Sequence, residues 1–243
     1  MPLPIIDARK FTQITNDWAE MFPEYGRPFK RYKGNFSKLV GPFKLNISIA
    51  VESYKDKYSS ETSLCPFFVQ LPDFSPAYLT VKTMRNGIIG WQGHTIHKLH
   101  EKAAEYMREH SAFPLEGEVR VSDILKAYKI YSDKDGFFIN NIESPALLCG
   151  WCGKPEFAPD WIKWGREKYL ALYARKLQRR EALKGTPEYD TYDLYTSPQK
   201  IDKWAEEMHQ RVQERDYLHH LAEEQIKRLK YDKIPRYELI IDI

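Results

Sequence analysis

The chain has 243 residues, of which 42% are hydrophobic and 14% aromatic, so it can bury a core of substantial size. A net charge of +3, from 37 basic and 34 acidic residues, is too small to indicate a polyanionic partner by itself. No run of 18 apolar residues occurs and the N-terminal residues show no signal-peptide pattern, so we expect neither a membrane span nor a secretory leader. Three cysteines do not fit a secreted disulfide scaffold. We therefore expect a cytoplasmic protein.

A helix followed by strands is expected at the start of the chain. Apolar residues at helical spacing predict a helix over 9–22, which Pro23 ends. A short hairpin is expected around Gly34-Asn35, with a turn at Gly41-Pro42. The clearest strand covers residues 43–51, where apolar side chains alternate with polar or small ones. The side chains expected to be buried on one face are Phe43, Leu45, Ile47, Ile49 and Val51.

The next segment predicts an antiparallel sheet. Polar residues 53–63 are interpreted as a loop, and three further strands are expected at 66–71, 78–84 and 88–91. The last two are expected to form a hairpin at Asn86-Gly87, because both residues accept the positive φ of a type I′ turn. Strands that follow one another without intervening helices pair as an antiparallel meander.

The pattern then becomes helical. A helix is expected over 95–109, and residues 122–131 fit either a short helix or a hairpin strand. Prolines and glycines between 144 and 160 mark the best candidate boundary. We therefore predict a sheet domain over 1–157 and a helical extension over 158–243, which can also form one cooperative unit if the C-terminus pairs with the sheet.

Two long antiparallel helices are predicted at 160–184 and 197–230, and residues 237–243 are interpreted as a final strand. The apolar residues expected to meet across this helical hairpin are Leu170, Tyr173, Leu177, Met208 and Val212. Arg215 continues the second apolar stripe, so we expect either a paired cation or a side chain that reaches water. The predicted fold class is thus α+β, with an antiparallel meander sheet, flanking helices, a C-terminal helical hairpin and a terminal strand.

The most specific short motif is Cys149-Gly-Trp-Cys152-Gly. Two thiolates on a tight turn can start a zinc site, but two further ligands would have to come from distant parts of the sequence. A redox dithiol would need a strand-to-helix context that is absent here. We favour two reduced thiols in a turn and expect no cofactor, with zinc bound by Cys149 and Cys152 as the alternative.

Histidines form two groups. His94, His97 and His100 are spaced three residues apart, so on a helix they spread over about 120° and cannot all point at one ion. We interpret them as a partly exposed helix start. For His219-His220, one ring is expected to face the partner helix of the predicted hairpin and the other solvent.

A basic and aromatic stretch covers residues 25–51, which contain no acidic residue. Basic side chains neutralise phosphates and aromatic rings stack on bases, so the stretch could bind nucleic acid or an acidic protein. The alternative is a solvated sheet face whose aromatics fill the core. The candidate partner- or anion-binding residues are Arg27, Lys30, Arg31, Tyr32, Lys33, Phe36 and Lys38. The helix at 163–184 is also basic, but acidic residues on its expected partner helix suggest that those charges neutralise each other.

No nucleotide-binding, nucleophile-elbow or helical zinc-protease motif occurs, which lowers the expectation of an enzyme without removing it. We favour a non-catalytic intracellular protein that binds a protein partner. The order of elements is analogous, at the level of the fold and without a shared motif, to immunity-type inhibitors encoded beside bacterial toxins. The alternative is a nucleic-acid-binding or nucleic-acid-processing protein that uses residues 25–51. A third hypothesis is an enzyme with a site near His94–His100 and Cys149.

Overall fold

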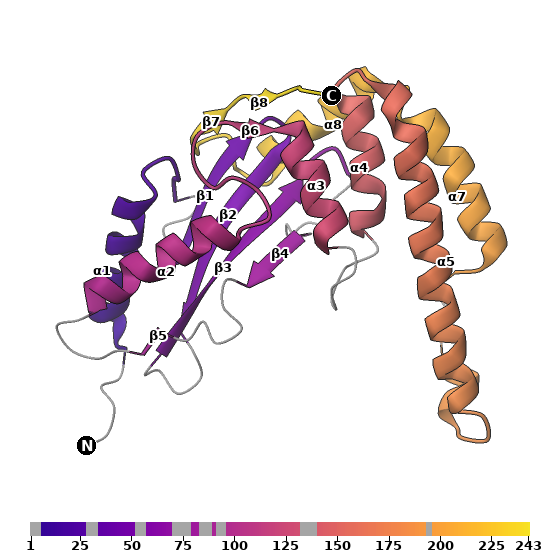
Figure 1. Cartoon of the computed structure of the whole chain (residues 1–243), viewed down its shortest axis with the longest axis horizontal. Helices are drawn as coiled ribbons and strands as arrows, with labels where there is room; N and C mark the ends of the chain where they lie inside the picture. Colours follow the sequence, from indigo (N-terminus) through magenta and orange to yellow (C-terminus); the bar gives the residue numbers. More distant parts are fainter. Residues whose placement is uncertain are drawn as a thin grey trace. The chain divides into compact units, whose positions relative to one another are not determined.

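The computed structural model describes residues 6–27, 34–51, 57–69, 79–82, 89–90, 96–131, 140–192 and 196–243. Its contacts divide the chain into two compact units, Met1–Tyr131 with Leu221–Ile243 and Ser132–His220, here called the sheet unit and the helical unit. The boundary between folding domains predicted near residue 157 stays a prediction. The predicted α+β class is confirmed: a mostly antiparallel sheet, a long helix pair and strands at the C-terminus are all present (Figure 1).

The sheet unit contains a six-stranded sheet in the order β4-β3-β2-β1-β7, with β5 also paired to β3. Its first five strands are β1 (Asn35–Val40), β2 (Phe43–Val51), β3 (Lys57–Pro66), β4 (Leu79–Lys82) and β5 (Ile89–Gly90). The expected turn at Gly41-Pro42 joins β1 to β2, and Gly41 has a φ of 52°, which glycine adopts without steric cost.

The strand predicted from alternation is β2, with the same bounds. Phe43, Leu45, Ile47 and Ile49 are buried as predicted, whereas Val51 at the strand end is only half-buried. The register places Phe36, Lys38 and Val40 of β1 and Tyr58 and Leu64 of β3 on this same face. We call it the first face of the sheet.

The polar loop predicted over 53–63 and the strand predicted over 66–71 were both partly wrong. Residues from Lys57 to Pro66 form β3, an internal strand of the sheet, while Phe67, Phe68 and Val69 are buried outside any strand. Ser60 and Thr62 occupy inward positions between Tyr58 and Leu64, so a hydrophobic pattern does not reveal the strand. Pairing with β2 on one side and β4 and β5 on the other satisfies its backbone.

Strands β4 and β5 lie along the same edge of β3 at successive positions. Leu79–Lys82 pairs with Glu61–Leu64, and Ile89–Gly90 pairs with Lys57 and Tyr58. The described parts of these strands therefore do not form the simple hairpin that the sequence predicted. The Asn86-Gly87 turn lies outside the described residues, as does the first strand of the hairpin expected around Gly34-Asn35.

Two helices cover the first face. α1 (Ala8–Met21) is capped at its N-terminus by Asp7, whose carboxylate accepts a hydrogen bond from the Lys10 N–H at 2.8 Å. α2 (Ile96–His110) contacts α1, and both helices hydrogen-bond to Tyr58 through Trp18 and His100. Both helices match their predicted positions. Residues 122–131, for which the sequence allowed either a helix or a hairpin strand, are helical. They belong to α3 (Val121–Tyr131), which directly follows the short strand β6 (Val119–Arg120).

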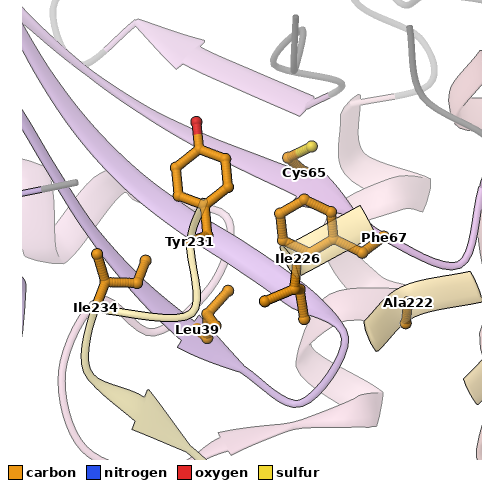
Figure 2. Close-up of a cluster of buried hydrophobic side chains, with 7 residues drawn as sticks. All are labelled: Leu39, Cys65, Phe67, Ala222, Ile226, Tyr231 and Ile234. Carbon is orange, nitrogen blue, oxygen red and sulfur yellow. The ribbon is translucent and has the colours of Figure 1, made fainter. Parts of the chain in front are cut away.

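The second face of the sheet is covered by the C-terminal part of the chain. Figure 2 shows Leu39 of β1 and Cys65 of β3 packed with Ala222, Ile226, Tyr231 and Ile234, and with Phe67. The buried amide of Gln225 donates to the carbonyl of Phe67 and, at 2.7 Å, to that of Val69. α8 (Arg215–Arg228) is thereby fastened to the sheet at its C-terminal end.

The final segment pairs with the sheet unit, as predicted. β7 (Arg236–Tyr237) adds to β1 in parallel, and β8 (Leu239–Ile240) pairs in parallel with β6. The terminal strand is thus two short strands, each joined to a different part of the unit.

The helical unit contains α4 (Asn140–Trp151), α5 (Ala158–Ala182), α6 (Glu188–Thr191) and α7 (Pro198–Arg211), with a short 3₁₀ turn at Pro155–Phe157. Helix α4 occupies the proline- and glycine-containing stretch and is buried along most of its length. A Cβ at Gly150 would lie 2.5 Å from the Val212 carbonyl oxygen, so only glycine allows this approach.

The predicted helix pair is present, but its second member is divided. Ser197 caps α7, Pro198 is its first residue, and the chain leaves the helix at Val212 before α8 begins at Arg215. No glycine or proline marks this break, so the sequence pattern did not reveal it. As a result Arg215 does not continue the apolar stripe. It is exposed, with its guanidinium beside Gly153, which fits the alternative in which the side chain reaches water.

The predicted pairing of side chains across the helices was also wrong. Trp204 of α7 packs against Gly165 and Tyr169 of α5, so α7 meets α5 several turns closer to the start of α5 than predicted. Leu177 is exposed.

Replacing Ile47 by Ala should lower the free energy of unfolding by about 2–5 kcal/mol, because it leaves a cavity in the first face of the sheet. Ile47 is fully buried, whereas Ala50 on the same strand is exposed. Ala50→Ser is therefore the matched control, expected within about 0.5 kcal/mol of the wild type in urea denaturation. Equal effects at the two positions would contradict the register.

Candidate functional site

The candidate anion-binding residues near the start of the chain are engaged inside the sheet unit where they are described. The Arg27 guanidinium donates to the Thr15 carbonyl at 3.1 Å and to Asn16 Oδ1 at 2.9 Å. Phe36 lies 5.3 Å from it and is buried. Lys30, Arg31, Tyr32 and Lys33 lie outside the described residues, and for them the anion-binding hypothesis stays a prediction.

Lys38 is fully buried and pairs with an acid. Its Nζ lies 2.5 Å from Glu24 Oε2 and within 5.3 Å of the ring centres of both Tyr25 and Tyr237. Burial of Glu24 opposes its ionisation, but hydrogen bonds from Lys38 and from the Gly117 N–H outweigh this effect and lower its pKa. Lys38 therefore holds the segment before β1 and the C-terminal strand to the sheet, and a surface ligand cannot reach it.

Cys149 and Cys152 form the end of a helix. Cys149 is buried in α4, its thiol donates to the Pro145 carbonyl at 3.3 Å, and burial raises its pKa to about 12. Gly153 follows with a φ of 70°, and the Lys154 N–H donates to the Cys149 carbonyl at 2.9 Å. Within the described ranges, no group of three or more His, Cys, Asp or Glu side chains could hold a metal ion.

The histidines have separate surroundings. His219 hydrogen-bonds through Nε2 to the Trp151 carbonyl at 2.8 Å and stacks on the Trp151 ring, so it contacts the end of α4 and not the predicted partner helix. His220 is exposed, as predicted for one member of the pair. His94 lies outside the described residues, and the side chain of His97 is not described. His100, in contrast, is buried, so the expected exposed helix start was wrong at this residue.

His100 belongs to a polar cluster that the sequence did not reveal. Trp18 Nε1 donates to the Tyr58 hydroxyl at 3.1 Å, the hydroxyl hydrogen-bonds to His100 Nδ1, and His100 Nε2 lies 3.7 Å from Asp17 Oδ2. This carboxylate–imidazole–hydroxyl order resembles acid–base machinery, but Tyr58 and Trp18 have no exposed surface. Burial also raises the pKa of Tyr58. The cluster therefore ties α1, α2 and β3 together.

The exposed surface with the clearest binding character lies on α5. Its buried residues are all in its first turns, Ala158, Trp161, Ile162 and Gly165, and none from Arg166 to Ala182 is buried. That second part nevertheless carries Leu170, Leu172, Tyr173 and Leu177, each half-buried or exposed. We call residues 166–182 the α5 arm. A helix this long is only marginally stable in isolation, so unburied apolar residues on it are noteworthy.

An ion pair joins the beginning of the arm to α7. Arg166 pairs with Asp202 of α7 at 2.7 Å. Because α7 starts four residues before Asp202, it extends only about 6 Å past Arg166 along α5. The interpretation that α7 neutralises the whole basic run was therefore wrong beyond the first turn. Arg180 instead lies 4.6 Å from the Tyr189 ring and donates to the Tyr189 carbonyl.

Comparisons with models of protein families, with curated proteins and with solved structures each found no match. None of the helices in the described part of the chain combines the length and apolar character needed to cross a membrane.

Replacing Tyr58 by Phe should lower the free energy of unfolding by about 1–3 kcal/mol, because the Trp18 and His100 nitrogens lose a shared buried partner. Tyr217→Phe is the control, since Tyr217 is 52% exposed. Urea denaturation followed by tryptophan fluorescence measures both. If Tyr58→Phe lowers the free energy of unfolding no more than Tyr217→Phe does, the polar cluster does not contribute to stability.

Replacing Glu24 by Gln should destabilise the protein by about 1–3 kcal/mol at pH 7, since buried Lys38 loses its partner. The folded-state pKa of Glu24 is lowered, so its contribution exists above the ordinary value of 4.5 and disappears as pH falls through the folded value. The gap between wild type and variant should therefore narrow below pH 4.5 in urea denaturation. Glu20→Gln, at an exposed acid, is the control. A gap that is constant with pH would contradict the ion pair.

Proposed function

We propose that this chain is a non-catalytic intracellular binding protein whose α5 arm engages a protein partner. The observation that carries the proposal is the absence of any buried residue from Arg166 to Ala182, in a helix that keeps presenting leucine and tyrosine there. Leu170, Tyr173 and Leu177 are spaced i, i+3 and i+7, so they share one side of the helix. This spacing is the anchor pattern by which a helix docks into a groove of another protein.

A protein partner explains the apolar residues better than a nucleic acid does. Nucleic-acid surfaces combine basic side chains with aromatic rings free to stack on bases. On α5, the Tyr169 ring is already stacked edge-on against Trp204, and the exposed apolar residue is Leu177. Leucine gains most by burial against another apolar surface.

An immunity-type inhibitor is a specific form of this proposal, in which the partner is a toxin. What supports this form is the order of helix, sheet and helices alone. The gene neighbourhood separates it from the alternative, since an adjacent toxin gene fits an inhibitor and an adjacent nuclease or polymerase gene fits the nucleic-acid hypothesis.

The proposal is tested with a photo-crosslinking amino acid placed at position 177 in cells of the source organism, with position 178 as the comparison. The protein crosslinked through 177 is then purified and its affinity measured by calorimetry. Leu177→Asn should raise Kd by about 10- to 100-fold, because one apolar anchor of about 1.5–3 kcal/mol is lost. Gln178→Asn, on another side of the exposed helix, should leave Kd unchanged.

A Leu177→Asn variant that binds the purified protein as tightly as wild type would refute the role of the arm. Binding of labelled single- or double-stranded oligonucleotides at low salt, with no protein crosslinked through 177, would favour the nucleic-acid alternative.

A further inference from the structure

One flank of the α5 arm carries a stripe of basic residues around a leucine. Lys168, Leu172, Arg175 and Arg179 follow one another at spacings of four, three and four residues, which places them in one row along the helix. Arg175 and Arg179 are exposed, and Leu172 is half-buried between them and Lys168. By helical geometry this row lies on a different side from the row of Leu170, Tyr173 and Leu177.

Neither arginine has an acidic residue three or four positions away along the helix. Across the arm and the residue pair that follows it, Arg166 to Lys184, the sequence has seven basic residues and two acidic ones, Glu167 and Glu181. Glu181 is in contact with the Tyr189 hydroxyl at 3.4 Å. In the described part of the chain, no salt bridge is formed by Arg175 or Arg179, whereas Arg166, nearer the body of the unit, is paired. Arg175 and Arg179, in the later part of the arm, therefore present positive charge that no acid of the described residues pairs with.

We propose that the partner's surface facing this row is acidic, and that Arg175 and Arg179 bind its carboxylates. This inference rests on the proposed function, because it assigns the chemistry of the partner that the arm engages. Residues four apart on a helix lie about 6 Å apart. The row therefore fits a pair of Asp or Glu side chains that are themselves one helical turn apart, each held by two parallel N–H···O bonds.

The position of Leu172 among the basic residues favours an acidic protein over another polyanion as the ligand. Leu172 lies in the row itself, one turn from Arg175, so a ligand that covers both arginines also covers an apolar side chain. An acidic amphipathic helix offers apolar side chains beside its carboxylates. A phosphate backbone offers none at that position.

The experiment compares the full chain with Arg175→Gln/Arg179→Gln and with Lys200→Gln/Lys227→Gln. The second pair removes the same charge from exposed lysines outside the arm. Fluorescence anisotropy measures binding to labelled poly-L-glutamate of about 20 residues and to single-stranded DNA of equal charge, at about 50 and 200 mM salt. Circular dichroism verifies that each variant keeps its helix content.

The arginine variant should bind polyglutamate about 5- to 30-fold more weakly than wild type, the equivalent of losing two surface ion pairs. The lysine variant should bind as wild type does. If the arginine and lysine variants lose the same affinity for polyglutamate, the attraction is non-specific and the inference is overturned. Tighter binding of the DNA, lost in the arginine variant, would reassign the row to nucleic acid. Failure of wild type to bind polyglutamate at the lower salt would also overturn it.

The affinity of each variant for the protein recovered by crosslinking distinguishes a failure of this inference from a failure of the proposed function. If Leu177→Asn weakens that complex and the arginine variant does not, the arm binds a protein but the acidic chemistry is wrong. If neither variant weakens it, both proposals fail.

Discussion

Both faces of the β1–β2–β3 sheet carry buried side chains, and the fold of the sheet unit follows from the need to cover both. The first face, with Ile47 and Ile49, is closed by α1 and α2. The second, with Leu39 and Cys65, is closed by residues 222–234 near the other end of the chain. The sheet unit therefore depends on residues more than 150 positions apart, and the short strand β7 extends the same sheet at its β1 edge.

Polar groups within this unit are placed where they connect elements. Lys38 joins β1 to Glu24 and to the tyrosine of β7, and Lys44 donates from the second face to the Tyr231 hydroxyl at 3.1 Å. Tyr58 joins α1 to α2. A buried charge or hydroxyl is costly unless partnered, so each such group favours one arrangement of the elements around it over others of similar apolar burial. Lys38 and Phe36 were candidate binding residues in the sequence, but both are buried and a surface ligand cannot contact them.

The helical unit distributes its chemistry differently. The first turns of α5 pack on α4 and α7 through Trp161, Ile162 and Gly165, and small residues at Gly150 and Gly165 allow close contacts there. The α5 arm has no such burial, and it carries both the apolar row and the basic row on which the proposed binding depends. The change from buried to unburied residues along α5 falls near Arg166, which forms an ion pair with Asp202 of α7.

The local sequence pattern was sufficient to predict α1, α2 and β2, the start of α7 at Ser197-Pro198, and the existence of α5. In α1, α2 and β2 one face is buried, and the spacing of apolar residues records it directly. The surface on the α5 arm was visible only as a basic run that an antiparallel neighbour was expected to neutralise. Which residues of α5 lie against α7 is set by Trp204 packing on Gly165 and Tyr169, a contact between residues far apart in sequence. Likewise β3 is a strand because two neighbours bond to it, although serines and threonines fill its inward positions. The sequence by itself thus specified local periodicity, while pairing, helix register and exposure were decided by tertiary contacts, because side chains distant along the chain bury or neutralise each other only when folding brings them together.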